Sequence, residues 1–237
     1  MVNCYAVATV IVSSEPNATY ALVNDPQHVV FLQHKCRIYG SSEVSIATAS
    51  TAPTRLRLAL EEMAVGVAKG FLRLEAAVNC DDSTTICDKE GQALVKQMTQ
   101  ELAGDMTRRG PWRLSLRRHI RLRVYRDLWE RGYVVTFGSK FGADFLIYKD
   151  NPEHAHAEAI IIVKDYEEEF ARVDIVSFCR LAKMVKKQFL FASVQAIEGN
   201  ESNDEQKDGN KVAMKSVVYI SLTHALLVSR QEERDSA

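Results

Sequence analysis

The stretch Val124–His156, with the sequence VYRDLWERGYVVTFGSKFGADFLIYKDNPEHAH, decides how the second half of this chain folds. It begins inside a segment with an apolar residue at every fourth position from 116 to 128, which predicts one apolar stripe on a helix. Gly132 stands where a left-handed residue would cap such a helix. We therefore expect the helix to end at this glycine.

Three strands are expected after the glycine. Residues 133–137 are β-branched and aromatic, residues 138–142 form a turn, and residues 144–148 read as the antiparallel partner strand. A polar loop then leads to a third strand at 157–163. The last residue of the second strand and the first residue before the third are thus expected at one edge of a sheet.

The hairpin carries an ordered motif. Residues 140–148 read K-F-G-A-D-F-L-I-Y, and RDLWERGY precedes them at 126–133. A histidine follows eight residues after the last tyrosine, and a lysine pair lies in RLAKMVKKQFL at 180–190. This set resembles the catalytic domain of the tRNA-splicing endonuclease family, and most of all the eukaryotic catalytic subunit that cuts the 3′ splice site. The resemblance extends over roughly residues 117–222.

The resemblance assigns three catalytic residues. Tyr148 matches the family's tyrosine, His156 its histidine and Lys187 its lysine, which stands late in a helix in the family pattern. His154 is two residues short of the matching position. Lys186 is one helical step from Lys187, which turns it away by about 100°.

These residue types suit RNA cleavage in which the ribose 2′-hydroxyl is the nucleophile. The reaction needs a base, an acid for the leaving 5′-oxygen and positive charge near the phosphorane. A phenol such as Tyr148 acts as a base when it is partly ionised, which cations such as Lys149 or Lys187 favour. An imidazole can hold a proton for the leaving group at neutral pH. The resemblance implies no metal and no other cofactor, and products with 2′,3′-cyclic phosphate and 5′-hydroxyl ends.

Four further residues are predicted to contact the substrate: Lys140, Arg180, Lys186 and His224. The last departs from the family, because Y-I-S-L-T-H at 219–224 resembles Y-x-S-L-x-W with histidine in place of tryptophan. Since that tryptophan helps to grip the RNA, weaker aromatic stacking is expected here.

Composition and charge restrict the class of protein. The chain has 237 residues, 46% of them hydrophobic, which suits a globular core, and a net charge of −1. Five cysteines without a C-x-x-C pair indicate reduced thiols in an intracellular protein. The apolar run near the N-terminus is too short to span a bilayer, so no membrane association is expected.

Arginines are dense from 108 to 131, and this density has two interpretations. They can contact RNA phosphates, or they can pair with acids on the polar face of a helix. Phosphate contacts leave no signature of their own in a sequence.

We predict an α/β fold with a small N-terminal mixed domain and a C-terminal mixed sheet flanked by helices, which the resemblance makes restriction-endonuclease-like. The expected divisions are an N-terminal domain at 1–78, a linker and connecting helix at 79–110, a catalytic domain at 111–229 and a tail at 230–237. In the N-terminal domain we expect a strand at 4–12, an apolar segment at 22–32 broken by Asp25-Pro26, a helix at 55–69 and a strand at 71–74. The connecting helix is expected at 92–106.

By resemblance, the partners are intron-containing pre-tRNA and the other subunits of a nuclear heterotetramer. An acidic run at 198–208 lies where the family carries a loop that enters a partner subunit. Three alternatives stay open: a subunit that cuts the 5′ splice site, which His156-Ala157-Glu158 favours; a non-catalytic structural subunit; and a metal-dependent nuclease with Asp144 and Glu158 as ligands. The last lacks the lysine expected two residues after the second acid, where Ile160 stands.

Overall fold

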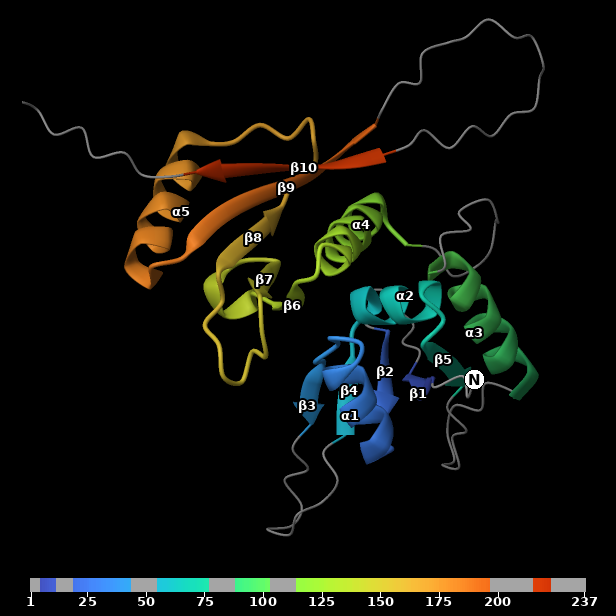
Figure 1. Ribbon diagram of the computed structural model, residues 1–237. Helices are drawn as coiled ribbons and strands as arrows, with labels where there is room; N and C mark the ends of the chain where they lie inside the picture. The colour runs from blue at the N-terminus through green and yellow to red at the C-terminus, as the bar shows by residue number, and fades with distance from the viewer. Residues whose placement is uncertain are drawn as a thin grey trace, which may run out of the picture.

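A computed structural model describes residues 5–11, 19–43, 55–76, 88–102, 114–196 and 215–222 of this chain. These residues form two five-stranded mixed sheets, each flanked by helices (Figure 1). The predicted fold class, α/β with mixed sheets covered by helices, is confirmed. In the described ranges, no helix is both long enough and apolar enough to cross a membrane.

The N-terminal sheet has the strand order β3-β4-β2-β1-β5. Its strands are β1 (Ala6–Ile11), β2 (Tyr20–Val23), β3 (Ser41–Glu43), β4 (Arg55–Leu58) and β5 (Leu72–Ala76), and its helices are α1 (Pro26–His34), α2 (Leu60–Ala68) and α3 (Asp88–Leu102). Only the pairing of β1 with β5 is parallel. Helices α2 and α3 pack against each other and against β5, while α1 contacts β1 and β2.

Two predictions for this half were wrong. The expected helix at 55–69 is the strand β4 followed by the shorter helix α2, because residues 55–58 alternate exposed arginine with buried leucine, a period of two. Asp25-Pro26 begins a helix instead of interrupting an apolar segment. The Asp25 carboxylate accepts a 2.8 Å hydrogen bond from the backbone N–H of Gln27, and Pro26 takes the first helical position.

The connecting helix begins earlier than predicted. Helix α3 starts at Asp88, inside the segment expected to be an exposed linker, and the predicted continuation beyond residue 102 lies outside the described residues. Val95, Met98 and Leu102 are buried and belong to the same core as the N-terminal sheet. This helix therefore packs on the N-terminal half.

The C-terminal sheet has the strand order β10-β9-β8-β7-β6. Its strands are β6 (Val134–Phe137), β7 (Phe145–Tyr148), β8 (Ala159–Val163), β9 (Gln188–Ala196) and β10 (Lys215–Leu222), and its helices are α4 (Leu116–Glu130) and α5 (Arg172–Val185). All neighbours are antiparallel except β8 and β9. The predicted hairpin, third strand and two later strands are thus confirmed.

Side chains of this sheet alternate between two cores. Phe145 and Ile147 belong to the core that includes α4, whereas Leu146 belongs to a second core that includes Phe178 and Val185 of α5. Because successive side chains of a strand point to opposite faces, α4 and α5 cover opposite faces of the sheet. Figure 1 shows α4 between the two sheets, with α2 between α4 and the N-terminal sheet.

Helix α4 joins the two halves of the molecule. Its predicted stripe holds at Val124 and Leu128, which are buried, but Leu116 is 62% exposed. The helix ends as expected, with Gly132 at a φ of +99°. On its N-terminal side it packs against α2.

An ion-pair network reinforces this joint. Glu61 on α2 is 1% exposed, and its Oε1 accepts hydrogen bonds of 3.0 Å from both Arg118 and Arg121 on α4. Arg121 also pairs with Asp144, the residue before β7. For these two arginines the acid-paired interpretation is the one observed; Arg108, Arg109 and Arg113 lie outside the described residues.

Candidate active site

Three adjacent strands begin or end at one edge of the C-terminal sheet. Ile147 of β7 is opposite Ala159 of β8, and Ala159 is opposite Gln188 of β9. The residues one step beyond this row are Tyr148, Glu158 and Lys187. Neighbouring strands are about 4.8 Å apart, so Tyr148 and Lys187 start from backbone positions only about 10 Å apart.

Tyr148 is half-buried at the end of β7. It packs against the core on the α5 face, beside Leu146, which has the same parity along the strand. Its backbone is opposite Val134 of β6. The Tyr148 side chain therefore packs against apolar side chains on one side and is accessible to solvent on the other.

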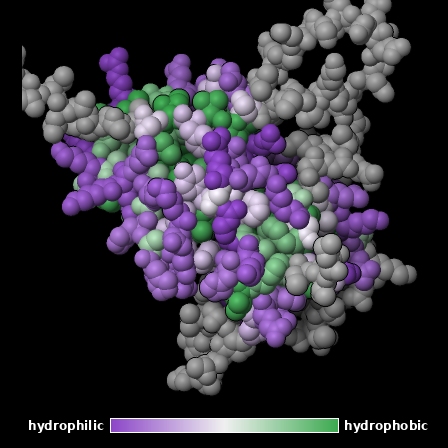
Figure 2. Space-filling view, viewed as in Figure 1, coloured by the Kyte–Doolittle hydropathy of each residue, from purple (hydrophilic) through white to green (hydrophobic). Residues whose placement is uncertain are grey.

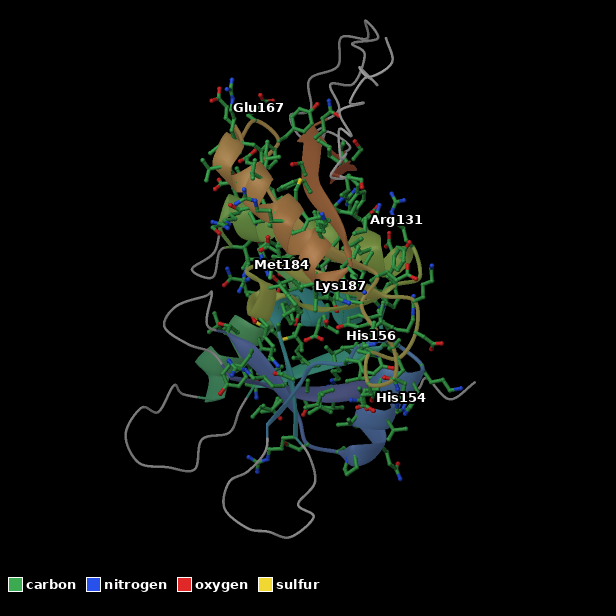
Figure 3. The ribbon with its side chains drawn as sticks, turned by 90° about the vertical axis from the view of Figure 1, so that its left-hand side faces the viewer. Arg131, His154, His156, Glu167, Met184 and Lys187 are labelled. Atoms are coloured by element: carbon green, nitrogen blue, oxygen red, sulfur yellow. The ribbon has the colours of Figure 1, made fainter. Side chains whose placement is uncertain are left out.

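His156 lies on the loop between β7 and β8 and is exposed. The loop turns at Asn151, whose side-chain oxygen accepts a 2.9 Å hydrogen bond from the N–H of Glu153 and whose carbonyl accepts one of 2.9 Å from Ala155. This turn returns the chain toward the sheet edge. Figure 3 shows His156 on the Lys187 side of the loop and His154 farther from Lys187.

Lys187 follows helix α5 instead of lying within it, which corrects the expectation of a lysine late in the helix. Lys186 has a φ of +52°, and the N–H of Lys187 donates a 3.1 Å hydrogen bond to Ala182 O. This is the six-to-one bond of a Schellman cap, here with lysine at the left-handed position. The Lys187 Nζ then donates a 2.9 Å hydrogen bond to Ala157 O, one residue after His156.

The structure brings Tyr148, His156 and Lys187 to the same end of the sheet. The other predicted contacts are spread more widely. Lys140 is exposed in the 3-10 turn η2 (Ser139–Phe141), which precedes β7, whereas Tyr148 is at the other end of that strand. Arg180 is exposed on α5.

Of the two remaining predicted contacts, Lys186 and His224, the structure describes only the first. Lys186 is exposed at the end of α5, next to Lys187. His224 lies outside the described residues. The acidic run at 198–208 also lies outside them.

An ion pair that the sequence did not reveal flanks the triad. Lys149 Nζ lies 2.6 Å from Glu158 Oε1, and this hydrogen bond raises the pKa of Lys149. This ion pair could be predicted only from the strand register, which puts Glu158 opposite Tyr148 and therefore next to Lys149. Lys149 is therefore engaged by a carboxylate instead of serving as a free cation beside the phenol.

The N-terminal half also approaches the loop that carries His156. Burial raises the pKa of Tyr39, between α1 and β3, and the carboxylates of Glu153 and Asp150 raise it further. Those two acids belong to the loop. Hydrophilic side chains gather on the surface over this part of the molecule (Figure 2).

The two acids of the metal-dependent alternative are far apart along the sheet. Asp144 precedes β7 and accepts hydrogen bonds from Arg121 and from the N–H of Val163, the latter at 2.7 Å. Glu158 is opposite the other end of β7 and pairs with Lys149. Across the residues that the structure describes, no group of three potential metal-ligating side chains occurs.

Comparison with known proteins matches the same region. Residues 119–200 match the family model for the tRNA intron endonuclease catalytic C-terminal domain. The chain is 40% identical over 75 residues to a tRNA-splicing endonuclease of Methanopyrus kandleri, which covers 32% of this chain and 42% of that protein. It is 41% identical over 76 residues to the mouse tRNA-splicing endonuclease subunit Sen34, covering 32% of this chain and 24% of that protein.

A third relative extends further. The chain is 31% identical over 109 residues to a tRNA-splicing endonuclease of Saccharolobus islandicus, covering 46% of this chain and 56% of that protein. The chain thus spans between about a quarter and somewhat over half of the length of these relatives. The motif, the sheet and the family model thus agree on one region of this chain, in which residues 119–200 are similar to the tRNA intron endonuclease catalytic domain.

Proposed function

We propose that this chain is a catalytic subunit of a tRNA-splicing endonuclease and cleaves pre-tRNA at the 3′ splice site. The observation that carries the proposal is the common sheet edge at which Tyr148, His156 and Lys187 lie, within a domain of the matching family. Its likeness to the mouse subunit Sen34 supports a place in a multi-subunit enzyme.

In the proposed reaction Tyr148 takes the proton of the ribose 2′-hydroxyl as this oxygen attacks the adjacent phosphorus. The bond from phosphorus to the 5′-oxygen breaks, and His156 gives its proton to that oxygen. The Lys187 ammonium stabilises the charge on the non-bridging oxygens of the phosphorane. The products carry a 2′,3′-cyclic phosphate and a 5′-hydroxyl, and every step uses side chains of this chain alone.

Substrate contacts and domain roles form part of the same proposal. Arg180, Lys186 and His224 would bind RNA near the triad, and Lys140 would bind it at the far end of β7. We divide the chain into an N-terminal domain at 1–78, a linker and connecting helix at 79–110, a catalytic domain at 111–229 and a tail. The enzyme would act in the nucleus as a heterotetramer.

One observation favours a second candidate. His156-Ala157-Glu158 resembles the subunit that cuts the 5′ splice site, whereas RDLWERGY resembles the subunit that cuts the 3′ site. The two candidates share the chemistry and differ only in the scissile bond.

End-group analysis of pre-tRNA fragments tests the proposal. The complex assembled with the wild-type chain should release 3′ exons with a 5′-hydroxyl and introns with a 2′,3′-cyclic phosphate, and the Lys187→Ala complex should lose this product only. Loss of 5′ cleavage instead would assign the chain to the other splice site. Unchanged cleavage at both sites would make the chain a structural subunit.

A further inference from the structure

Glu158 occupies the middle of the row that holds Tyr148 and Lys187. Its N–H donates a 2.8 Å hydrogen bond to Ile147 O, and its carbonyl accepts one of 3.2 Å from Gln188. The residue is thus tied by its backbone to both neighbouring strands. The position of its backbone between the two strands is therefore fixed by the sheet.

Two lysines contact the segment just before β8, one through the Glu158 side chain and one through the backbone next to it. Lys149 Nζ is 2.6 Å from Glu158 Oε1. Lys187 Nζ instead donates its 2.9 Å hydrogen bond to the carbonyl of Ala157, the residue bonded to Glu158. Of the two lysines, only Lys149 forms the ion pair with Glu158.

The group that binds the Lys187 ammonium determines how much of its positive charge can act on a phosphate. A carboxylate that pairs with an ammonium offsets most of its field and holds it in a fixed direction. If Glu158 paired with Lys187, the cation would face the protein and less of its charge would act on a phosphate. The backbone carbonyl of Ala157 carries no net charge, so it fixes the position of Lys187 without neutralising it.

The ion pair is unsuited to a purely structural role. The side chain of Lys149 is 71% exposed and that of Glu158 is 38% exposed, and ion pairs so exposed add little to stability. The backbone hydrogen bonds already join the strands. What the pair does accomplish is to occupy the carboxylate.

We propose that Lys149 is a positioning residue that holds the Glu158 carboxylate away from Lys187, so that the Lys187 ammonium stays available to the scissile phosphate. This inference rests on the proposed function of the triad. It gives Lys149 an indirect role, without contact to the RNA, and it makes Glu158 a potential inhibitor within the site.

A double-mutant cycle tests this role. In the assembled complex, Lys149→Met should lower kcat for 3′ cleavage about fivefold, the factor expected from the upper range of exposed ion pairs, with KM unchanged. Lys149→Arg should retain the wild-type kcat because it keeps the pair. Glu158→Gln alone should change little, and Lys149→Met combined with Glu158→Gln should recover the lost rate, since no carboxylate is left to capture Lys187.

Recovery is the decisive outcome, because a lysine that merely stabilised the fold or bound RNA would not be rescued by Glu158→Gln. A double variant as slow as Lys149→Met would overturn the proposal. So would a rise in KM together with a weaker dependence of KM on salt, which would indicate that Lys149 contacts a phosphate directly. Lys96→Met, on α3, is the matched control and should leave kcat unchanged.

A second measurement does not depend on cleavage. The ¹⁵N signal of the Lys187 ammonium in the full chain, assigned with Lys187→Arg, should shift in Lys149→Met and return in the double variant. An unchanged signal would overturn the inference even in an active enzyme. If the wild-type complex failed to cleave pre-tRNA, the proposed function would fail while this signal still reported on the ion pair.

Discussion

The Nζ of Lys187 donates a 2.9 Å hydrogen bond to the carbonyl oxygen of Ala157, thirty residues earlier in the chain. Ala157 follows His156 directly, so this bond fixes the end of the loop that carries the histidine to the start of β9. The proposed acid and the proposed phosphate-binding cation are therefore positioned by the same contact. The turn between α5 and β9 determines where that contact forms.

The left-handed conformation of Lys186 gives a first prediction. Replacing it with glycine should raise the free energy of unfolding by about 1 kcal/mol, because glycine adopts a φ of +52° without steric cost. Lys186→Val should lower the free energy of unfolding by about 1–2 kcal/mol and lower kcat, because a β-branched residue disfavours the turn that delivers Lys187. Urea unfolding and single-turnover cleavage measure the two effects.

Lys183→Gly is the matched control for this turn. Lys183 lies within α5, where glycine costs about 1 kcal/mol, so the same substitution should have the opposite sign one turn earlier. Lys186→Gly also separates two roles. If Lys186→Gly raises the free energy of unfolding but weakens RNA binding, Lys186 both contacts the RNA and shapes the turn. If it lowers the free energy of unfolding, the expectation based on the positive φ of Lys186 is wrong.

The second prediction concerns the joint between the two halves. Arg121→Met leaves the buried carboxylate of Glu61 and that of Asp144 without one of their cations, and breaking a buried ion pair in this way typically costs 3–5 kcal/mol. We expect a loss of about 3 kcal/mol in the free energy of unfolding, measured by urea denaturation. Arg117→Met, at an exposed position on the same helix, should stay within about 0.5 kcal/mol of the wild type. Equal effects of the two substitutions would refute the importance of the network.

Glu62 gives a prediction for pH. This residue is 2% exposed on α2, and burial raises its pKa from 4.5 to about 7 against the hydrogen bonds from Ala59 N and Gly40 N. A raised pKa means that the folded chain binds the proton more tightly than the unfolded chain. The free energy of unfolding should therefore fall as pH rises from about 4.5 to about 7, by on the order of 3 kcal/mol, and level off above.

The comparison of Glu62→Gln with the wild type from pH 5 to 8 isolates this titration. The variant should lack the decline, although it can be less stable overall, because the amide nitrogen that replaces one carboxylate oxygen cannot accept a backbone N–H bond. Glu167→Gln, at an exposed position before α5, should retain the wild-type decline (Figure 3). A difference between the wild type and Glu62→Gln that stays constant or rises over this interval would contradict a raised pKa of Glu62.

A fourth prediction addresses the chemistry. Cleavage by the assembled complex should be indifferent to EDTA, since the three side chains supply base, acid and charge. Tyr148→Phe and His156→Ala should each lower kcat by about 10²–10⁴, the usual contribution of a general acid or base. His154→Ala, on the same loop, and Tyr166→Phe, an exposed tyrosine, are the matched controls. Inhibition by EDTA that added magnesium reverses would favour a metal-dependent nuclease.

The local elements of the C-terminal half follow from the amino-acid sequence alone. The hairpin, the glycine at the end of α4 and the strands β8 to β10 were predictable because each depends on a few neighbouring residues: a glycine with positive φ, or a run of β-branched and aromatic side chains. Motif order and spacing also pointed to Tyr148, His156 and Lys187. In the N-terminal half, the same reasoning missed the period of two in residues 55–58 and the cap at Asp25.

Which charged side chains form ion pairs depends on the packing of distant segments. Arg118 and Arg121 could have faced RNA, but packing of α4 on α2 brings them to Glu61. Strand register, set by hydrogen bonds between distant segments, puts Glu158 between Tyr148 and Lys187 and lets Lys149 take its carboxylate. A sequence records which groups are present near one another along the chain, whereas the strength of an electrostatic contact depends on distance and burial, and both arise only when separate segments pack together.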